Sequence, residues 1–233
     1  MATKQVGSTG EEILLNHRKT SRTKHNPDQD IASENPRNQG SFIDTLHRLD
    51  IELSRRLSFC AAKSSGWRPV LIALEISGHG VPWIIATLLA IYFFRNEKQQ
   101  FALNFLLALL LDLVIVGLTK MIFQRQRPVY NEKDMFATVS VDKFSFPSGH
   151  STRAAMVAAL FNLIISSSCL RLVINLWACC VAISRVVLGR HHVFDVVFGA
   201  IIGLGQYWLM VNIWLSMEFS QRFLMLVPYV DLK

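Results

Sequence analysis

Long apolar runs, separated by short polar segments, fill the chain between Val70 and Trp214. A helix needs about 20 apolar residues to cross a bilayer, and several of these runs approach that length. We therefore predict an all-α fold, a polytopic membrane helical bundle over residues 66–217. Four of its spans are expected at about 101–123, 148–165, 172–188 and 193–215.

The first apolar region is less regular than the others. The run from Val70 to Ile76 is followed by the break "SGHG" at 77–80 and a second run from Val81 to Phe94. Each run alone is short for a span. Either the two form one kinked span, or the first is a re-entrant or interfacial piece.

An amphipathic helix is expected at 42–64, ahead of the apolar region. Its apolar residues recur every three or four positions and charged residues fill the positions between them, a helical pattern whose charges exclude a span. The helix either lies on the membrane surface or packs on the membrane domain. Residues 1–41 form a polar tail expected to be disordered, and residues 218–233 a short C-terminal tail. The apolar positions of the helix are Phe42, Leu46, Leu49, Leu53 and Leu57.

The charge distribution adds an orientation. The chain has a net charge of +7, concentrated in the first 68 residues and between Lys120 and Lys143. Such an excess is typical of cytoplasmic membrane faces beside anionic lipids. No basic stripe with interleaved aromatic residues supports nucleic-acid binding. The polar N-terminus does not resemble a signal peptide, and the four cysteines lack a paired framework, so we expect buried free thiols.

Three polar clusters interrupt the apolar runs. The first, "KMIFQRQRP", places Lys120 and Arg127 about 10 Å apart along one helix face. The second is "PSGH" at 147–150, and the third is "SRVVLGRHHVFD" at 184–195. The first cluster ends one span, the second begins the next, and the third joins the last two. With short connections, all three lie at one membrane face, which the basic loops predict to be cytosolic.

The gathered side chains suit a phosphate group better than a metal ion. Guanidinium groups match phosphate oxygens, and an ammonium adds a point charge. Gly149 allows close approach of the backbone, and the N–H groups that open its helix point at an anion. The expected phosphate ligands are Lys120, Arg127, Ser148, Gly149 and Arg185, and no metal or cofactor is expected.

The histidines supply the chemistry. His191 and Asp195 are four residues apart and share a face if they lie on one helix. The carboxylate then accepts a proton from one imidazole nitrogen and leaves the other as a nucleophile. His150 is expected to be the general acid that protonates the leaving oxygen.

Other polar residues in or near the spans have structural interpretations. His192 points about 100° away from His191 on a helix and is taken as structural. His79 is read as a turn residue, with substrate contact as the alternative. Two acids are expected to be buried helix contacts, and two arginines to extend toward lipid headgroups rather than to phosphate. These are Asp112, Glu75, Arg125 and Arg153.

The three clusters together resemble the type 2 phosphatidic acid phosphatase superfamily. The matching pattern is Lys-x6-Arg-Pro, Pro-Ser-Gly-His and Ser-Arg-x5-His-x3-Asp, here from Lys120 to Asp195. The resemblance implies metal-independent dephosphorylation of lipid phosphates through a phosphohistidine. The stretches "EISGHGVPW" and "NEKDMFATVSVDKFSFPSGHSTRAA" resemble the polyisoprenoid diphosphate/phosphate phosphohydrolases, the presqualene diphosphate phosphatase group.

That subgroup implies isoprenoid diphosphate substrates and a location in the endoplasmic reticulum and nuclear envelope. Alternatives are a phosphatase of phosphatidic acid, lysophosphatidate or sphingoid phosphates, and a silent membrane scaffold of the same fold. The intact His150, His191 and Asp195 argue against a scaffold. A transporter is disfavoured because the charges gather at one face rather than along a path. The partners expected are the substrate and membrane lipids, and the sequence does not specify an oligomeric state.

Overall fold

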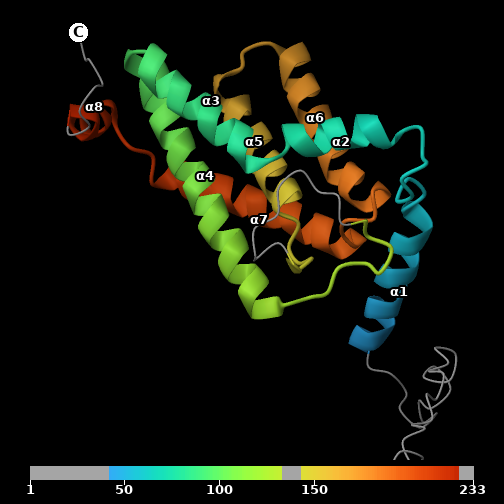
Figure 1. The fold of residues 1–233 in the computed structure, drawn as a ribbon. Coiled ribbons are helices and arrows are strands. Elements are labelled where there is room, and N and C mark those ends of the chain that lie inside the picture. Colours follow the sequence, from blue (N-terminus) through green and yellow to red (C-terminus); the bar gives the residue numbers. More distant parts are fainter. Residues whose placement is uncertain (1–41, 133–142, 226–233) are drawn as a thin grey trace, which may run out of the picture. The chain divides into compact units, whose positions relative to one another are not determined.

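The structure is a computed structural model that describes residues 42–132 and 143–225 (Figure 1). Helices dominate these residues, and one isolated antiparallel bridge joins Gln126 to Phe144. The all-α prediction is confirmed. The helices are α1 (Phe42–Leu57), α2 (Arg68–Ser77), α3 (Gly80–Phe93), α4 (Asn96–Phe123), α5 (Gly149–Ile164), α6 (Ser168–Val187), α7 (Val193–Asn212) and α8 (Met217–Met225).

Three described helices, α4, α6 and α7, are long and apolar enough to cross a membrane. Helices α2 and α3 meet at a bend of 43° and count as at most one further span. With 10 and 14 residues, neither has the length to cross alone. Helix α5 matches the span expected at 148–165 but has 16 residues, which is short for a span.

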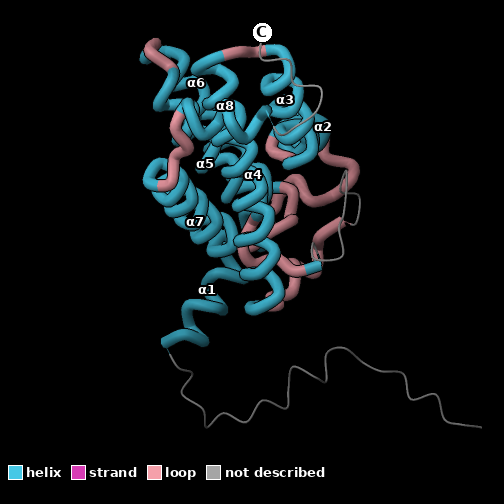
Figure 2. Tube along the Cα trace, turned by 90° about the vertical axis from the view of Figure 1, so that its left-hand side faces the viewer, coloured by secondary structure: helices cyan, strands magenta, loops and turns pink. Residues whose placement is uncertain are grey.

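Helix α5 occupies the inside of the bundle, where it packs against α4, α6 and α7 (Figures 1 and 2). Two glycines of α7 allow close contact with α5. A Cβ at Gly199 would lie 2.8 Å from the carbonyl oxygen of Ser148, and one at Gly203 would clash with the backbone of Thr152. Small residues at such positions let membrane helices approach closely. This contact fixes the start of α5 relative to the start of α7.

Helix α1 joins this end of the bundle beside the start of α7 (Figure 2). It ends at Leu57, earlier than the expected residue 64. Its buried residues are the polar Asp50 and Ser54, whereas Phe42 and Leu49 are exposed. The helix therefore packs on the membrane domain through polar contacts and turns most of its large apolar residues outward.

The outer surfaces of α3, α4, α6 and α7 carry many exposed large apolar side chains, as expected where helices face lipid. The four cysteines are free, but the expectation of burial holds only for Cys60. Cys169, Cys179 and Cys180 are exposed on α6. The predicted disordered tail at 1–41 and the last eight residues lie outside the described part, while α8 forms within the expected C-terminal tail.

Candidate active site

His191 lies buried in the short loop between α6 and α7. Gly189 turns the chain after α6 with a φ of 70°, a conformation that favours glycine. Nδ1 of His191 is 2.7 Å from the carbonyl oxygen of Ser145. Because a carbonyl only accepts, Nδ1 carries the proton and Nε2 keeps a lone pair. Burial lowers the pKa of His191 to about 3, so the imidazole is neutral at physiological pH.

Asp195 supports this loop differently from the expectation. Helix α7 begins at Val193, so His191 precedes the helix and does not share a helical face with Asp195. The closest approach of Nδ1 of His191 to the carboxylate is 3.8 Å, too long for a hydrogen bond. Asp195 instead accepts from the backbone N–H of His192 at 2.8 Å and lies 3.2 Å from Nδ1 of that residue. His192 is thus structural, as predicted, and closes the start of α7.

A buried ion pair network reinforces the start of α7. Arg125 reaches Asp195 at 2.7 Å and Asp50 of α1 at 2.6 Å. Asp50 also accepts from the backbone N–H of Phe194 at 3.0 Å, and the Ser54 hydroxyl accepts from the backbone N–H of Val193 at 2.9 Å. These contacts satisfy N–H groups that a helix start leaves open. The expectation that Arg125 extends toward lipid headgroups is wrong, because it bridges α1 and α7.

The start of α5 places His150 opposite His191. Ser148 caps the helix: its hydroxyl oxygen faces the backbone N–H of Ser151 at 3.5 Å, and its own N–H donates to the carbonyl of Asp195 at 3.0 Å. Nε2 of His150 is buried and has no hydrogen-bond partner in the described part of the chain. A polar ring atom buried without a partner is costly and indicates a position prepared for a ligand.

Three of the predicted cations converge on the two histidines. Lys120 comes from the last turn of α4, Arg127 from the segment after it, and Arg185 from the last turn of α6. Nη1 of Arg127 donates to the carbonyl oxygen of Arg190 at 3.2 Å. Glu75 of α2 lies 3.2 Å from Arg185 and 3.3 Å from Arg190, so one carboxylate holds both guanidinium groups. The interpretation of Glu75 as a buried helix contact is confirmed.

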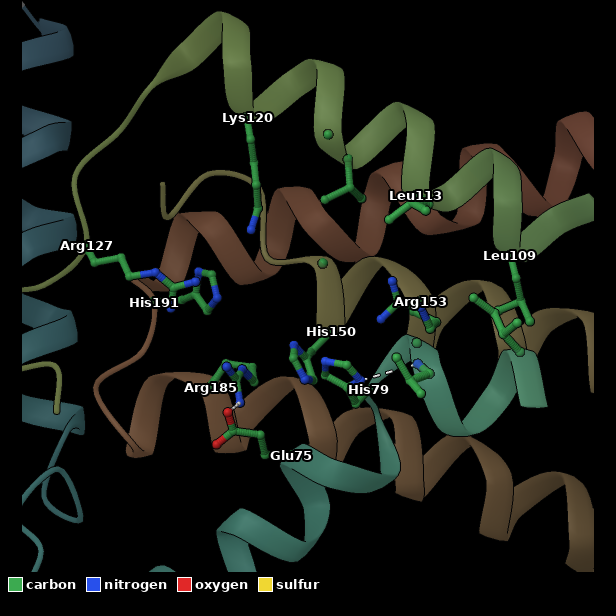
Figure 3. A pocket seen from close by; sticks show the side chains of 16 residues that line it. Glu75, His79, Leu109, Leu113, Lys120, Arg127, His150, Arg153, Arg185 and His191 are labelled. Atoms are coloured by element: carbon green, nitrogen blue, oxygen red, sulfur yellow. Dashed lines mark hydrogen bonds and ion pairs between the residues drawn. The ribbon is translucent and has the colours of Figure 1, made fainter. Parts of the chain in front are cut away.

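These side chains line one cavity of about 440 Å³ (Figure 3). The polar end carries the two histidines and three cations, and the other end is lined by apolar residues of α3 and α4. Six of the eight predicted site residues line the cavity: Lys120, Arg127, Gly149, His150, Arg185 and His191. Ser148 and Asp195 are buried but do not line it, so their contacts support the wall rather than face a ligand.

Several residues at or near the cavity lie outside the predicted set of site residues. His79 caps α3, where Nδ1 accepts from the backbone N–H of Val81 at 3.3 Å, and it also lines the cavity. Arg153 was expected to extend toward headgroups, but it lines the cavity and pairs with Asp112 at 2.7 Å. Asp112 is thus a buried helix contact, as predicted. Arg190 and Asp50 were not singled out, although Arg190 directly precedes His191 in the sequence.

The donor set of the described residues does not resemble a metal centre. No group of three or more His, Cys, Asp or Glu side chains within 42–132 and 143–225 is arranged to hold a metal ion. The carboxylates near the cavity, Glu75, Asp112 and Asp195, each pair with arginines. The cavity is therefore built to attract an anion.

Comparisons with known proteins point to membrane phosphatases. "Probable lipid phosphate phosphatase beta" of Arabidopsis thaliana is 35% identical over 192 residues, which cover 70% of this chain and 87% of that protein. The crystal structure of a transmembrane PAP2-type phosphatidylglycerolphosphate phosphatase from Bacillus subtilis matches with a TM-score of 0.58 and 25% identity, covering 72% of this chain and 86% of that one. LpxE of Aquifex aeolicus has the same fold, with a TM-score of 0.56, 22% identity, and coverage of 70% and 95%.

The sequence model of the PAP2 superfamily matches residues 101–217, a range that contains all eight predicted site residues. This match confirms the predicted membrane fold and the predicted class of enzyme, a PAP2-type phosphatase. From the match and the 35% identical relative together, we conclude that the chain belongs to the PAP2 superfamily.

Proposed function

We propose that this protein is an integral-membrane phosphatase that hydrolyses prenyl diphosphates and monophosphates through a phosphohistidine on His191, without a metal ion. The observation that carries the proposal is the hydrogen bond from Nδ1 of His191 to the Ser145 carbonyl. It leaves Nε2 as a neutral nucleophile in a cavity that is cationic at this end and apolar at the other.

In the first step, Nε2 of His191 attacks the terminal phosphorus and the bond from phosphorus to the leaving oxygen breaks. Lys120, Arg127 and Arg185 neutralise the phosphoryl oxygens, the role that metal ions take in many phosphoryl transfers. His150 protonates the leaving oxygen. A bound phosphate dianion favours the imidazolium form of His150, which is the form that can donate.

In the second step, water attacks the phosphorus on His191 and the phosphorus–nitrogen bond breaks. Neutral His150 now accepts the proton of the water, which restores its starting form, and inorganic phosphate leaves. Asp195 acts through the loop: its bonds to His192 and Arg125 keep the loop of His191 at the start of α7. We therefore assign it a positioning role.

The apolar end of the cavity supports a lipid chain as the leaving group. Ile84 of α3 and Leu109, Leu113 and Val116 of α4 line it, and Val81 lies at the bend. Branched side chains offer a close fit to the methyl branches of a prenyl chain. The second candidate is a glycerolipid monophosphate, favoured by the name of the Bacillus subtilis enzyme of similar fold.

The proposal includes a location. We assign the phosphatase domain to residues 66–217, place it in the endoplasmic reticulum membrane and nuclear envelope, and orient the cavity toward the cytosol. The orientation is supported by basic residues in two segments that would lie on this side of the membrane. Arg55 and Arg56 precede the first apolar run, and Arg125 follows α4. If the bent α2–α3 pair crosses the membrane once, α4 crosses back and its last turn lies on the side where the chain started.

Phosphate release by the purified protein in detergent with excess chelator tests the substrate class. The substrates are farnesyl diphosphate, farnesyl phosphate, phosphatidate and phosphatidylglycerol phosphate. We expect kcat/KM for the farnesyl substrates to exceed that for the glycerolipids by about tenfold or more, since the fit of a chain to an apolar pocket discriminates on this scale. A His191→Ala variant gives the background. Preference for phosphatidate would replace the proposal with the second candidate.

A further inference from the structure

We propose that Arg153 and His79 form a second phosphate subsite, which holds the phosphate that stays on the lipid when the terminal phosphate of a diphosphate is removed. The inference deepens the proposed function and rests on it for the position of the scissile phosphate beside His191. It gives this chain a determinant for diphosphates over monophosphates, in residues outside the Lys-x6-Arg-Pro, Pro-Ser-Gly-His and Ser-Arg-x5-His-x3-Asp pattern.

The position of Arg153 follows from the helix that carries it. It lies three residues after His150 in α5, so both side chains leave the same helix face about one turn apart. Arg153 is the deeper of the two, because α5 begins at Gly149 beside the catalytic groups. Figure 3 shows Arg153 on the far side of His150 from His191, toward Leu113 and Leu109. A group at Arg153 therefore lies between the scissile phosphate and the lipid chain.

Arg153 is held in place with donors to spare. Its Nη2 pairs with Asp112 at 2.7 Å, and its Nη1 donates to the carbonyl oxygen of Gly78 at 3.3 Å. A guanidinium has five N–H donors, so these two described contacts leave three for a ligand. Burial of a charged pair inside a membrane protein is costly and marks a functional position. Asp112 fixes the guanidinium from behind while the side chain still lines the cavity.

The break between α2 and α3 gives the guanidinium its space. A Cβ at Gly80 would lie 3.1 Å from Cζ of Arg153, closer than side chains normally pack. His79, in the same break, uses Nδ1 to accept from Val81, so the ring proton is on Nε2, which can donate to an oxygen. The ring centroids of His79 and His150 are 5.8 Å apart. Both residues of the subsite thus lie beside the general acid, on its side away from His191 (Figure 3).

The charges of the cavity match a diphosphate. Among the described residues, four cationic side chains line it, Lys120, Arg127, Arg153 and Arg185, against one carboxylate, Glu75. When Nε2 of His191 attacks the terminal phosphorus, the bond to the bridging oxygen breaks, and that oxygen stays on the prenyl monophosphate and takes the proton of His150. Arg153 neutralises the charge of this departing phosphate. A monophosphate places its one phosphate at His191 and leaves the subsite without a phosphate.

The test compares two substrates with the same chain, farnesyl diphosphate and farnesyl phosphate, in Arg153→Gln. We expect kcat/KM for the diphosphate to fall about 10- to 100-fold, as for the loss of a charge-assisted contact, and kcat/KM for the monophosphate to change less than about threefold. Arg153→Lys keeps the positive charge but lacks the paired N–H donors of a guanidinium, so its kcat/KM for the diphosphate should fall less. Arg171→Gln, an exposed arginine bonded to the carbonyl of Ile165, is the matched control and should change neither value.

An equal loss on both substrates, or an unchanged value for the diphosphate, would overturn the subsite and leave Arg153 a structural role with Asp112. If Arg153→Gln does not fold, the substrate ratio in Arg153→Lys decides in the same way. Diacylglycerol diphosphate and phosphatidate form a second pair with a common chain. If the wild type acts on these and on no prenyl substrate, the proposed chain class fails, while the Arg153 ratio on this pair still tests the subsite.

Discussion

Replacing Asp50 by alanine tests whether α1 holds the loop of the proposed nucleophile, His191. Asp50 is 1% exposed, accepts from the backbone N–H of Phe194 at 3.0 Å, and pairs with Arg125 at 2.6 Å. Arg125 in turn reaches Asp195 at 2.7 Å. The substitution removes one acceptor from the start of α7 and one of the two carboxylates that pair with Arg125.

The magnitude follows from these two losses. An unpaired buried donor costs about 1–3 kcal/mol. Loss of one partner from a fully buried ion pair costs about 3–5 kcal/mol. Arg125 is 18% exposed and keeps Asp195 as a partner, so the loss of its pairing with Asp50 should cost no more than the lower end of that range. We expect about 3 kcal/mol in total. A loop displaced by 1 Å can lower a rate by about 100-fold, so kcat should fall at least tenfold.

The assay measures kcat on a prenyl monophosphate and the thermal unfolding midpoint in one detergent. Asp50→Asn keeps an oxygen for Phe194 but loses the charge for Arg125, so its effect should be intermediate. Glu52→Gln is the matched control, because this exposed residue of α1 pairs with Arg55 and Arg56 on the surface, where solvent screens the pairing, and should leave kcat and the midpoint nearly unchanged. Wild-type kcat and midpoint in Asp50→Ala would refute the role of α1.

Four further outcomes follow. His191→Ala should abolish turnover in a folded protein, and His150→Ala should lose about 10²–10⁴-fold yet still trap phosphate on His191 from an activated leaving group; near-normal turnover of His191→Ala would exclude the mechanism. Chelators should leave activity intact and vanadate should inhibit, whereas strict dependence on magnesium would contradict a cationic site. With the pKa of His191 at about 3, protonation of this residue should not lower kcat/KM between pH 8 and 5. In the unfolded state the pKa returns to about 6.5, so the unfolded chain binds a proton that the folded chain does not, and the contribution of His191 to stability falls as the pH drops from about 6.5 toward 3. Acid unfolding of wild type and His191→Ala measures this difference. A single cysteine at Asn131 in a cysteine-free variant should react with an impermeant thiol reagent in sealed microsomes; reaction only after permeabilisation would place the cavity in the lumen.

The helices of the membrane domain could be predicted because their signals are local. The expected spans at 101–123 and 193–215 agree with α4 and α7 within a few residues at each end. Apolar runs and the breaks between them decide these elements wherever the chain folds. The gathering of Lys120, His150 and His191 at one end also followed from sequence order alone, because antiparallel helices with short connections return to the same face.

The orientation of single side chains could not be predicted in the same way. Charges on an amphipathic helix indicate a solvated face, yet Asp50 is buried because Arg125 and the start of α7 meet it there. The pairing of His191 with Asp195 assumed one continuous helix, but α7 begins two residues after His191 and the Ser145 carbonyl takes its proton. Both outcomes depend on segments that are distant in sequence, which periodicity does not contain.

Four described acids, three near the cavity and Asp50 behind it, each hold an arginine from another element. Asp50 and Asp195 hold Arg125, Asp112 holds Arg153, and Glu75 holds Arg185 and Arg190. An unpaired acid so close to a phosphate would repel it, whereas a paired acid fixes an arginine and leaves its other donors for the ligand. Of these four acids, only Asp195 belongs to the spacing pattern of the three clusters. The groups that orient the cations therefore lie largely outside the spacing pattern, on α1, α2 and the middle of α4, and differences among them can change the substrate while the proposed catalytic histidines stay the same.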